Sequence, residues 1–315
     1  MKSRNILMAV VLSLSLLAGC GAGAGETKEE TPGSPEEKTI SVATSINPIH
    51  ELVKIVGGDL VDPMRIVPSG ADAHTFEPTI KDMAALAKVD VLFINGLTLE
   101  PWADKAAENS GNKSLKIAVL SNGVDLIHLD EVEDDHDHEE ETKDGHDHGE
   151  FDPHVWLSID ALIIMAKNIQ TELMSLAPQH EATFAENFEA FEKEALALKE
   201  EYVEKFKPYA GKGFVTGHAA FGYMTRELGI VQKSVEGPFQ EGEPTPKTLE
   251  DLINFVKEEN ITTIFIEEQA SPKVSETLAR ESGSKTVVIN PLESDGGLLA
   301  SIEENYKKIL GSFEQ

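Results

Sequence analysis

Hydrophobic and polar positions alternate between short β-type runs and helical periodicities along the first half of the chain. Runs rich in Val and Ile predict strands, and apolar residues spaced three or four positions apart predict helices between them. The expected strands are 39–44, 64–67, 89–94 and 115–119, and the expected helices are 49–56, 80–88 and 159–173. This strand–helix order predicts a parallel sheet covered by helices.

One helical pattern in the middle of the chain is much longer than the others. Residues 178–208 contain no Gly or Pro between the two terminal prolines. Apolar residues recur there at steps of three and four, at Phe184, Phe188, Phe191, Ala195, Leu198, Tyr202 and Phe206. The pattern predicts a single helix of about eight turns with one continuous apolar stripe, which joins two halves of the molecule.

The second half of the chain repeats the alternation of the first. The expected strands are 213–216, 232–235, 262–267 and 286–289, and the expected helices are 219–228, 246–259, 272–282 and 297–310. We therefore predict an α/β protein with an N-terminal lobe at 39–177, a linking helix at 178–208 and a C-terminal lobe at 209–315. Ligands of open α/β sheets bind at the carboxyl ends of the strands, so we expect the site in the cleft between the lobes.

The first 38 residues differ in character from the rest. Lys2 and Arg4 precede an apolar run that is too short to span a bilayer, and small residues follow it, so we interpret 1–19 as a secretory signal. Cys20 is the single cysteine and cannot form an internal disulfide. Its position after Leu-Ala-Gly resembles a bacterial lipobox, which implies acylation of its thiol and a membrane anchor; the alternative is a chance cysteine. Residues 20–38 have the composition of a flexible tether.

The acidity of the chain is concentrated in one segment. The formal net charge is -29, which argues against nucleic acid as a partner. Residues 130–150, within a His- and acid-rich loop at 128–150, hold twelve Asp or Glu and one Lys. Four histidines accompany them, His136, His138, His146 and His148. Imidazoles beside carboxylates predict a solvated loop that collects metal ions, with a merely solvated charge run as the alternative.

Three other histidines occupy equivalent places, where a predicted strand meets a helix or a turn. These are His74, His154 and His218. One such histidine would be interpreted as a satisfied polar residue, but three at matching positions predict a metal site. His50 and His180 fall on predicted helix surfaces, where we expect them to be solvated. His128, beside the acidic loop, has weaker support as part of the collecting group.

Two segments resemble motifs of a known family. Gly70-Ala-Asp-Ala-His74-Thr-Phe-Glu-Pro78 and Asp152-Pro-His154-Val-Trp-Leu157 are similar to motifs of the metal-specific solute-binding lipoproteins of bacterial ABC transporters, particularly the ZnuA/AdcA type. The resemblance runs from about Thr39 to the C-terminus. Ala73 stands where the family pattern has proline, which affects the local turn rather than the ligand.

The resemblance implies a metal held between two lobes by residues of both. His74 and His154 would be first-lobe ligands, and His218 stands where the zinc branch has histidine and the manganese branch has glutamate. We expect Glu293 as the fourth ligand with Asp295 in reserve, while a water or a loop histidine remains an alternative. Further carboxylates are expected to orient ligand imidazoles or line the cleft, namely Glu77, Asp152, Glu267 and Glu268.

The function expected from this resemblance is extracytoplasmic capture of Zn²⁺ and its delivery, by a monomer, to an ABC permease and its partner ATPase. Manganese or iron delivery and a role as an adhesin are the alternatives among binding proteins. A zinc-dependent hydrolase is the alternative among enzymes, since three histidines with an open position also describe catalytic zinc sites. No His-Glu-x-x-His motif occurs, because the segment His180–Phe184 lacks the second histidine. We therefore predict a binding protein and not an enzyme.

Overall fold

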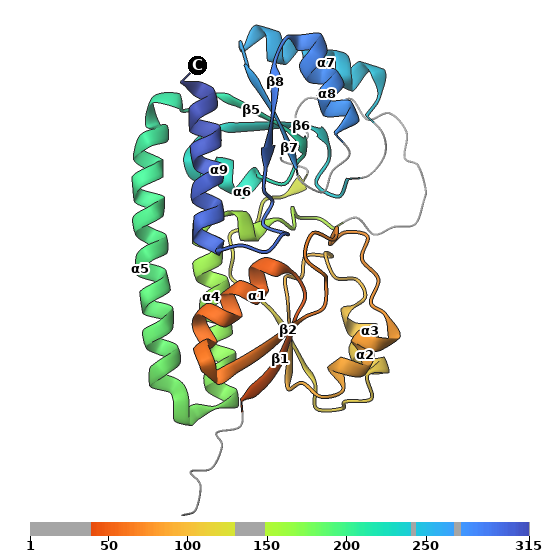
Figure 1. The fold of residues 1–315 in the computed structure, drawn as a ribbon, viewed down its shortest axis with the longest axis vertical. Helices are drawn as coiled ribbons and strands as arrows, with labels where there is room; N and C mark the ends of the chain where they lie inside the picture. Colours follow the sequence, from red (N-terminus) through yellow and green to blue (C-terminus); the bar gives the residue numbers. More distant parts are fainter. Residues whose placement is uncertain (1–38, 130–148, 241–243, 268–271, 315) are drawn as a thin grey trace, which may run out of the picture. The chain divides into compact units, whose positions relative to one another are not determined.

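Two parallel four-stranded sheets form the framework of the computed structural model, which describes residues 39–129, 149–240, 244–267 and 272–314 (Figure 1). The first sheet has the order β2-β1-β3-β4 and the second β6-β5-β7-β8. The strands are β1 (Ile40–Thr44), β2 (Val61–Arg65), β3 (Val91–Ile94), β4 (Lys116–Val119), β5 (Gly213–His218), β6 (Val231–Glu236), β7 (Thr263–Glu267) and β8 (Lys285–Ile289). All neighbouring strands pair in parallel, which confirms the predicted fold class.

Helices connect and cover these strands. They are α1 (Asn47–Gly57), α2 (Ile80–Leu86), α3 (Ala103–Asn109), α4 (Ile159–Leu176), α5 (Glu181–Phe206), α6 (Gly222–Leu228), α7 (Pro246–Glu258), α8 (Lys273–Ser282) and α9 (Leu298–Phe313). None of the helices in the described ranges is long and apolar enough to cross a membrane.

The structure differs from the predicted elements at a few places. The second strand begins at Val61 rather than residue 64, because β2 lies at the edge of its sheet, where Pro63 is tolerated. Helix α3 was not predicted. The helix expected at 219–228 begins at Gly222, since β5 extends to His218.

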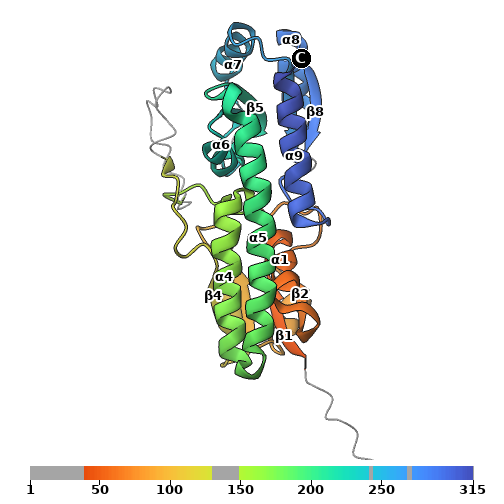
Figure 2. The same ribbon diagram turned by 90° about the vertical axis from the view of Figure 1, so that its left-hand side faces the viewer.

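Helix α5 packs against both lobes. It contacts α4 and α1 of the first lobe and α9 and α6 of the second, and Figures 1 and 2 show it running beside both groups. Short 3-10 turns replace the α-helix at the two ends of the predicted span 178–208. The predicted stripe is buried apart from Leu198, which is half-buried.

One hydrophobic core extends through both lobes. It includes Val42 and Phe93 in the first sheet, Phe184 on α5, and Phe214 and Tyr306 in the second lobe. A smaller core lies between the second sheet and the helices α7 and α8. Because the larger core crosses from one lobe to the other, the lobes are held together by apolar packing as well as by the chain.

Several predicted features lie outside the described residues. They are the signal segment 1–19, Cys20, the tether 20–38, Glu268 and the four loop histidines His136, His138, His146 and His148.

Candidate metal centre

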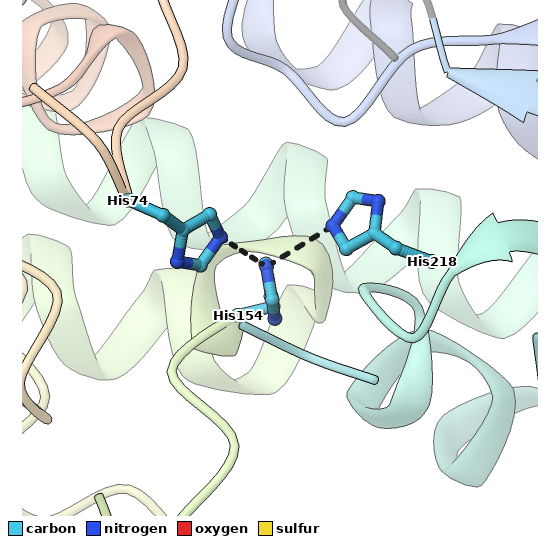
Figure 3. A group of neighbouring side chains, drawn as sticks. All are labelled: His74, His154 and His218. Carbon is cyan, nitrogen blue, oxygen red and sulfur yellow. Dashed lines mark hydrogen bonds between the residues drawn. The ribbon is translucent and has the colours of Figure 1, made fainter. Parts of the chain in front are cut away.

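Three histidine side chains, separated by more than 60 residues in the sequence, meet at one point (Figure 3). The Nε2 atoms of His74 and His154 are 3.2 Å apart, and those of His218 and His154 are 3.4 Å apart. A tetrahedral zinc site with Zn–N bonds of about 2.0–2.1 Å places its nitrogens about 3.3–3.4 Å from one another. The two nitrogen pairs that include His154 therefore have the spacing of ligands around one metal ion, and the three ligand atoms all lie within 4.8 Å of one another.

Each histidine comes from a different part of the fold. His74 lies in the loop after β2, His154 directly precedes the 3-10 turn Val155–Leu157, and His218 is the last residue of β5. His74 and His154 belong to the first lobe and His218 to the second, as the sequence predicted. The metal site is thus formed between the lobes.

Asp152 orients the ring of His154. Its Oδ1 accepts a hydrogen bond from Nδ1 of His154 at 2.8 Å and from the backbone N–H of His154 at 2.9 Å. With Nδ1 donating, Nε2 carries the lone pair that a metal needs. Burial raises the pKa of Asp152 to about 7 and lowers the pKa of His154 well below its usual value. The expected supporting role of Asp152 therefore has a geometric basis.

Glu267 lies behind His218 in a similar way. Its Oε1 is 3.2 Å from the backbone nitrogen of His218, which donates to it, and 3.5 Å from Nδ1 of the ring. Burial lowers the pKa of His218, but the hydrogen bond and charge of Glu267, together with the charges of Glu293 and Asp152, outweigh that effect and the net pKa is raised. Both side chains are almost completely buried.

Glycines make room for these two carboxylates. A Cβ on Gly217 would lie 2.3 Å from Oε2 of Glu267, and a Cβ on Gly222 would lie 2.9 Å from Oδ2 of Asp152. Any larger residue at either position would push the carboxylate away from its histidine. Both contacts join residues far apart in the sequence, so no local sequence pattern predicts them.

His74 is held differently from the other two. Its backbone N–H donates to Oδ1 of Asp72 at 2.8 Å, and its ring packs edge-on against Phe239 at a centroid distance of 6.1 Å. Burial lowers the pKa of His74 to about 3. Glu77, expected to support a ligand imidazole, is exposed, and it makes no hydrogen bond to His74 within the described part of the chain. Phe239, which follows Gly-Pro in a loop, was not predicted to contact the site.

The two acidic candidates for a fourth ligand have different surroundings. Glu293 is 7 % exposed, and burial raises its pKa to about 7 while the nearby His218 opposes the rise. Among the described residues, the group whose ligand atoms all lie within 4.8 Å of one another consists of the three histidines, and Glu293 is not part of it. The side chain of Asp295 is 72 % exposed and binds Arg65 at 2.6 Å.

The other histidines in the described ranges, His50, His128 and His180, do not join the cluster. His50 is half-buried, 3.5 Å from Oγ1 of Thr44, and burial lowers its pKa, so the expectation of a solvated residue was wrong. His128 lies 3.5 Å from Glu150, opposite Phe151 in an isolated antiparallel bridge. His180 packs against the ring of Phe184 on α5.

Comparisons with known proteins place this geometry in a family. The chain matches a family model described as the periplasmic zinc-uptake complex component A, ZnuA, over residues 42–312. It is 34% identical to the high-affinity zinc uptake system protein ZnuA of Bacillus subtilis over 290 residues, which cover 91% of this chain and 88% of that protein. It is 32% identical to the zinc-binding lipoprotein AdcA of Streptococcus pneumoniae over 313 residues, 98% of this chain and 59% of that protein.

A structural comparison agrees with these matches. The crystal structure of a Zn(II)-bound variant of AdcAII of Streptococcus pneumoniae superposes with a TM-score of 0.77 at 33% sequence identity, covering 87% of this chain and 98% of that one. The chain spans about 59% of the length of the AdcA relative. The match agrees with the prediction of a binding protein and not an enzyme, and the chain belongs to the ZnuA family of metal-binding solute-binding proteins.

Proposed function

We propose that this protein binds Zn²⁺ outside the cytoplasm and delivers the ion to an ABC permease for uptake. The observation that carries the proposal is that Nε2 of His154 lies 3.2 Å from Nε2 of His74 and 3.4 Å from Nε2 of His218, which is the spacing between neighbouring ligands in a tetrahedral zinc shell. Imidazole nitrogen suits zinc, whereas manganese prefers carboxylate and water oxygen. A three-histidine set therefore favours zinc over manganese delivery.

Glu293 completes the proposed shell. It is buried, and its strongest electrostatic interaction is with His218. A bound cation would stabilise the ionised form of this carboxyl group, whose pKa burial raises. In this proposal Glu293 moves toward the three histidines as the metal binds and supplies the fourth ligand oxygen.

The proposed assembly follows from the family. The matched family model describes a component of a zinc-uptake complex, and the relatives in Bacillus subtilis and Streptococcus pneumoniae are named for zinc uptake and zinc binding. A permease and its ATPase are accordingly the proposed partners of a monomer. Acylated Cys20 and the tether 20–38 would hold the lobes 39–177 and 209–315, with their linking helix 178–208, at the membrane.

The loop histidines are proposed to act before the cleft. His136, His138, His146 and His148 would collect zinc weakly and exchange it rapidly, because their carboxylate-rich surroundings raise the local concentration of cations. The three cleft histidines would then bind the ion tightly.

The decisive experiment measures metal stoichiometry and competition between zinc and manganese for the intact protein. We expect one tight zinc that excess manganese does not displace, and loss of this site in His218→Ala. His50→Ala is the matched control, since it removes a half-buried imidazole outside the cluster. Tight zinc binding that survives His218→Ala, or ready displacement by manganese, would refute the assignment.

A further inference from the structure

The segment that carries Glu293 is bonded mainly to the lobe to which it does not belong in sequence. Residues 291–295, here called the strap, connect β8 to α9, and Figure 1 shows this connection reaching toward α1. Four consecutive strap carbonyls accept hydrogen bonds from first-lobe donors: Pro291 from Trp156 Nε1 at 2.9 Å, Leu292 from Asn47 Nδ2 at 3.1 Å, Glu293 from Gly70 N at 3.1 Å and Ser294 from Asn47 Nδ2 at 2.7 Å.

The change of lobe occurs within one residue. Asn290, directly before the strap, exchanges two hydrogen bonds with Asn305 of α9, at 3.1 and 2.6 Å, and so belongs to the second lobe. Leu292 is buried and has a φ of 71°, a left-handed conformation that is unfavourable for a residue with a side chain. Such a conformation persists only where surrounding contacts determine it. Here the Leu292 N–H donates to Oδ1 of Asn290 at 2.7 Å, and the Leu292 carbonyl accepts from Nδ2 of Asn47 in the first lobe at 3.1 Å.

Asn47 is the central donor of this arrangement. It is buried at the start of α1, and both strap carbonyls that it binds flank Glu293 in the sequence. Nη1 of Arg65 donates to Oδ1 of Asn47 at 2.5 Å and to Oδ1 of Asp295 at 2.6 Å. A guanidinium can only donate, so Arg65 fixes the amide oxygen on its side and leaves the amide nitrogen for the strap.

We propose that Asn47 is a positioning residue for the fourth metal ligand. By binding the carbonyls on either side of Glu293, it fixes the backbone from which that side chain reaches the site, and it makes Glu293 move with His74 and His154 rather than with His218. This inference rests on the proposed function, in which Glu293 ligates zinc. Loss of the Asn47 amide leaves the three histidines in place and removes two of the four hydrogen bonds that hold the strap to the first lobe.

The test is a double-mutant cycle on zinc affinity, measured by competition with a chelator of known affinity. Asn47→Ala is expected to weaken zinc binding about 10- to 100-fold, the usual effect of removing a group that orients a ligand. In a Glu293→Gln background the same change is expected to weaken binding less than about threefold, because the ligand that Asn47 positions is already gone. Asn168→Ala is the matched control: its amide also donates to two carbonyls, Leu120 and Asn122, both within the first lobe.

Stability of the metal-free protein is measured alongside, and Asn47→Asp serves as a variant of equal volume that removes both donors. A selective loss of affinity in Asn47→Ala and Asn47→Asp that vanishes in the Glu293→Gln background supports the proposal. Equal effects of Asn47→Ala and Asn168→Ala, or an undiminished effect in the Glu293→Gln background, overturn it. Failure of the proposed function shows separately, as a wild-type protein without a tight zinc or a Glu293→Gln variant with unchanged affinity.

Discussion

Gly217 is the position where the smallest change is expected to disturb the metal site most. Its Cβ, if present, would lie 2.3 Å from Oε2 of Glu267. Carbon–oxygen contacts in proteins are seldom shorter than about 3.3 Å, so the carboxylate must retreat by roughly 1 Å. Gly217 lies in β5, which is paired on both sides by β6 and β7, so the backbone cannot yield instead. In Gly217→Ala the side chain of Glu267 is therefore the group that must move.

The retreat of Glu267 removes the group behind His218. The backbone hydrogen bond of 3.2 Å and the 3.5 Å approach to Nδ1 would both be lost. We expect zinc affinity to fall about 10- to 100-fold, or about 1.4–2.7 kcal/mol. Overpacking is also expected to lower the free energy of unfolding by about 1–3 kcal/mol. Chelator competition measures the first effect and denaturant unfolding of the metal-free protein measures the second.

Two variants make this prediction specific. Gly237→Ala adds the same methyl group where no atom lies within 4 Å, and it should change neither quantity. Glu267→Ala should lower zinc affinity by a similar factor, and adding Gly217→Ala to it should cost little more, because the two changes remove the same contact. If Gly217→Ala binds zinc within about threefold of wild type, or if the two affinity losses add in full, the orienting role of Glu267 is wrong.

Three further outcomes follow from the site and the core. Zinc affinity should fall as pH drops from 7.5 to 5.5, because burial raises the pKa values of Asp152 and Glu293 to about 7, the net pKa of His218 is raised, and zinc must therefore displace protons. Chelator competition across this range measures the effect, and the fall in affinity should be shallower for Glu293→Gln. An affinity that does not change with pH contradicts the prediction. Phe239→Ala removes a contact with the ring of His74, and such a contact contributes about 0.5–1.5 kcal/mol. Zinc release, measured by stopped-flow transfer to a chelator, should become about 2- to 12-fold faster. An unchanged rate would show that the ring does not retain the metal. Phe206→Ala should lower the free energy of unfolding by about 3–5 kcal/mol in denaturant titrations, because this ring is buried between α5 and α9, and a loss below about 1 kcal/mol would refute its place in the core.

The parts of the fold that depend on local pattern were predictable. Phe184, Phe188 and Phe191 repeat at helical spacing, and α5 buries that stripe. Helix α3 was missed because its seven residues, Ala103–Asn109, contain no large apolar side chain to mark a period. The first residues of β2 were missed because proline normally excludes a strand, and whether that strand lies at an edge is decided by the rest of the sheet.

The candidate site likewise has parts that the sequence predicted and parts that it did not. The gathering of three histidines could be anticipated, since each stood where a predicted strand meets a helix or a turn, although only His218 lies at the end of a strand. Asp152 lies two residues from its histidine, so its support could be expected as well. Glu267 was expected to orient a ligand imidazole or to line the cleft, but its pairing with His218, 49 positions away, and the pairing of Asn47 with a residue 245 positions away are determined by tertiary packing. A single sequence carries no periodic signal for them.

The three histidines differ in how firmly they are held, and this difference bears on capture and release. His154 and His218 each have a buried carboxylate behind the ring, and each carboxylate is pressed against a glycine. In the described part of the chain no carboxylate binds the His74 ring; Asp72 holds its backbone instead. Two ligands are therefore pre-oriented and the third can turn at little cost. A transport protein must bind its ion tightly and still release it. A site with one adaptable ligand can do both, because the shell can open at His74 while the other two imidazoles keep their geometry for the next ion.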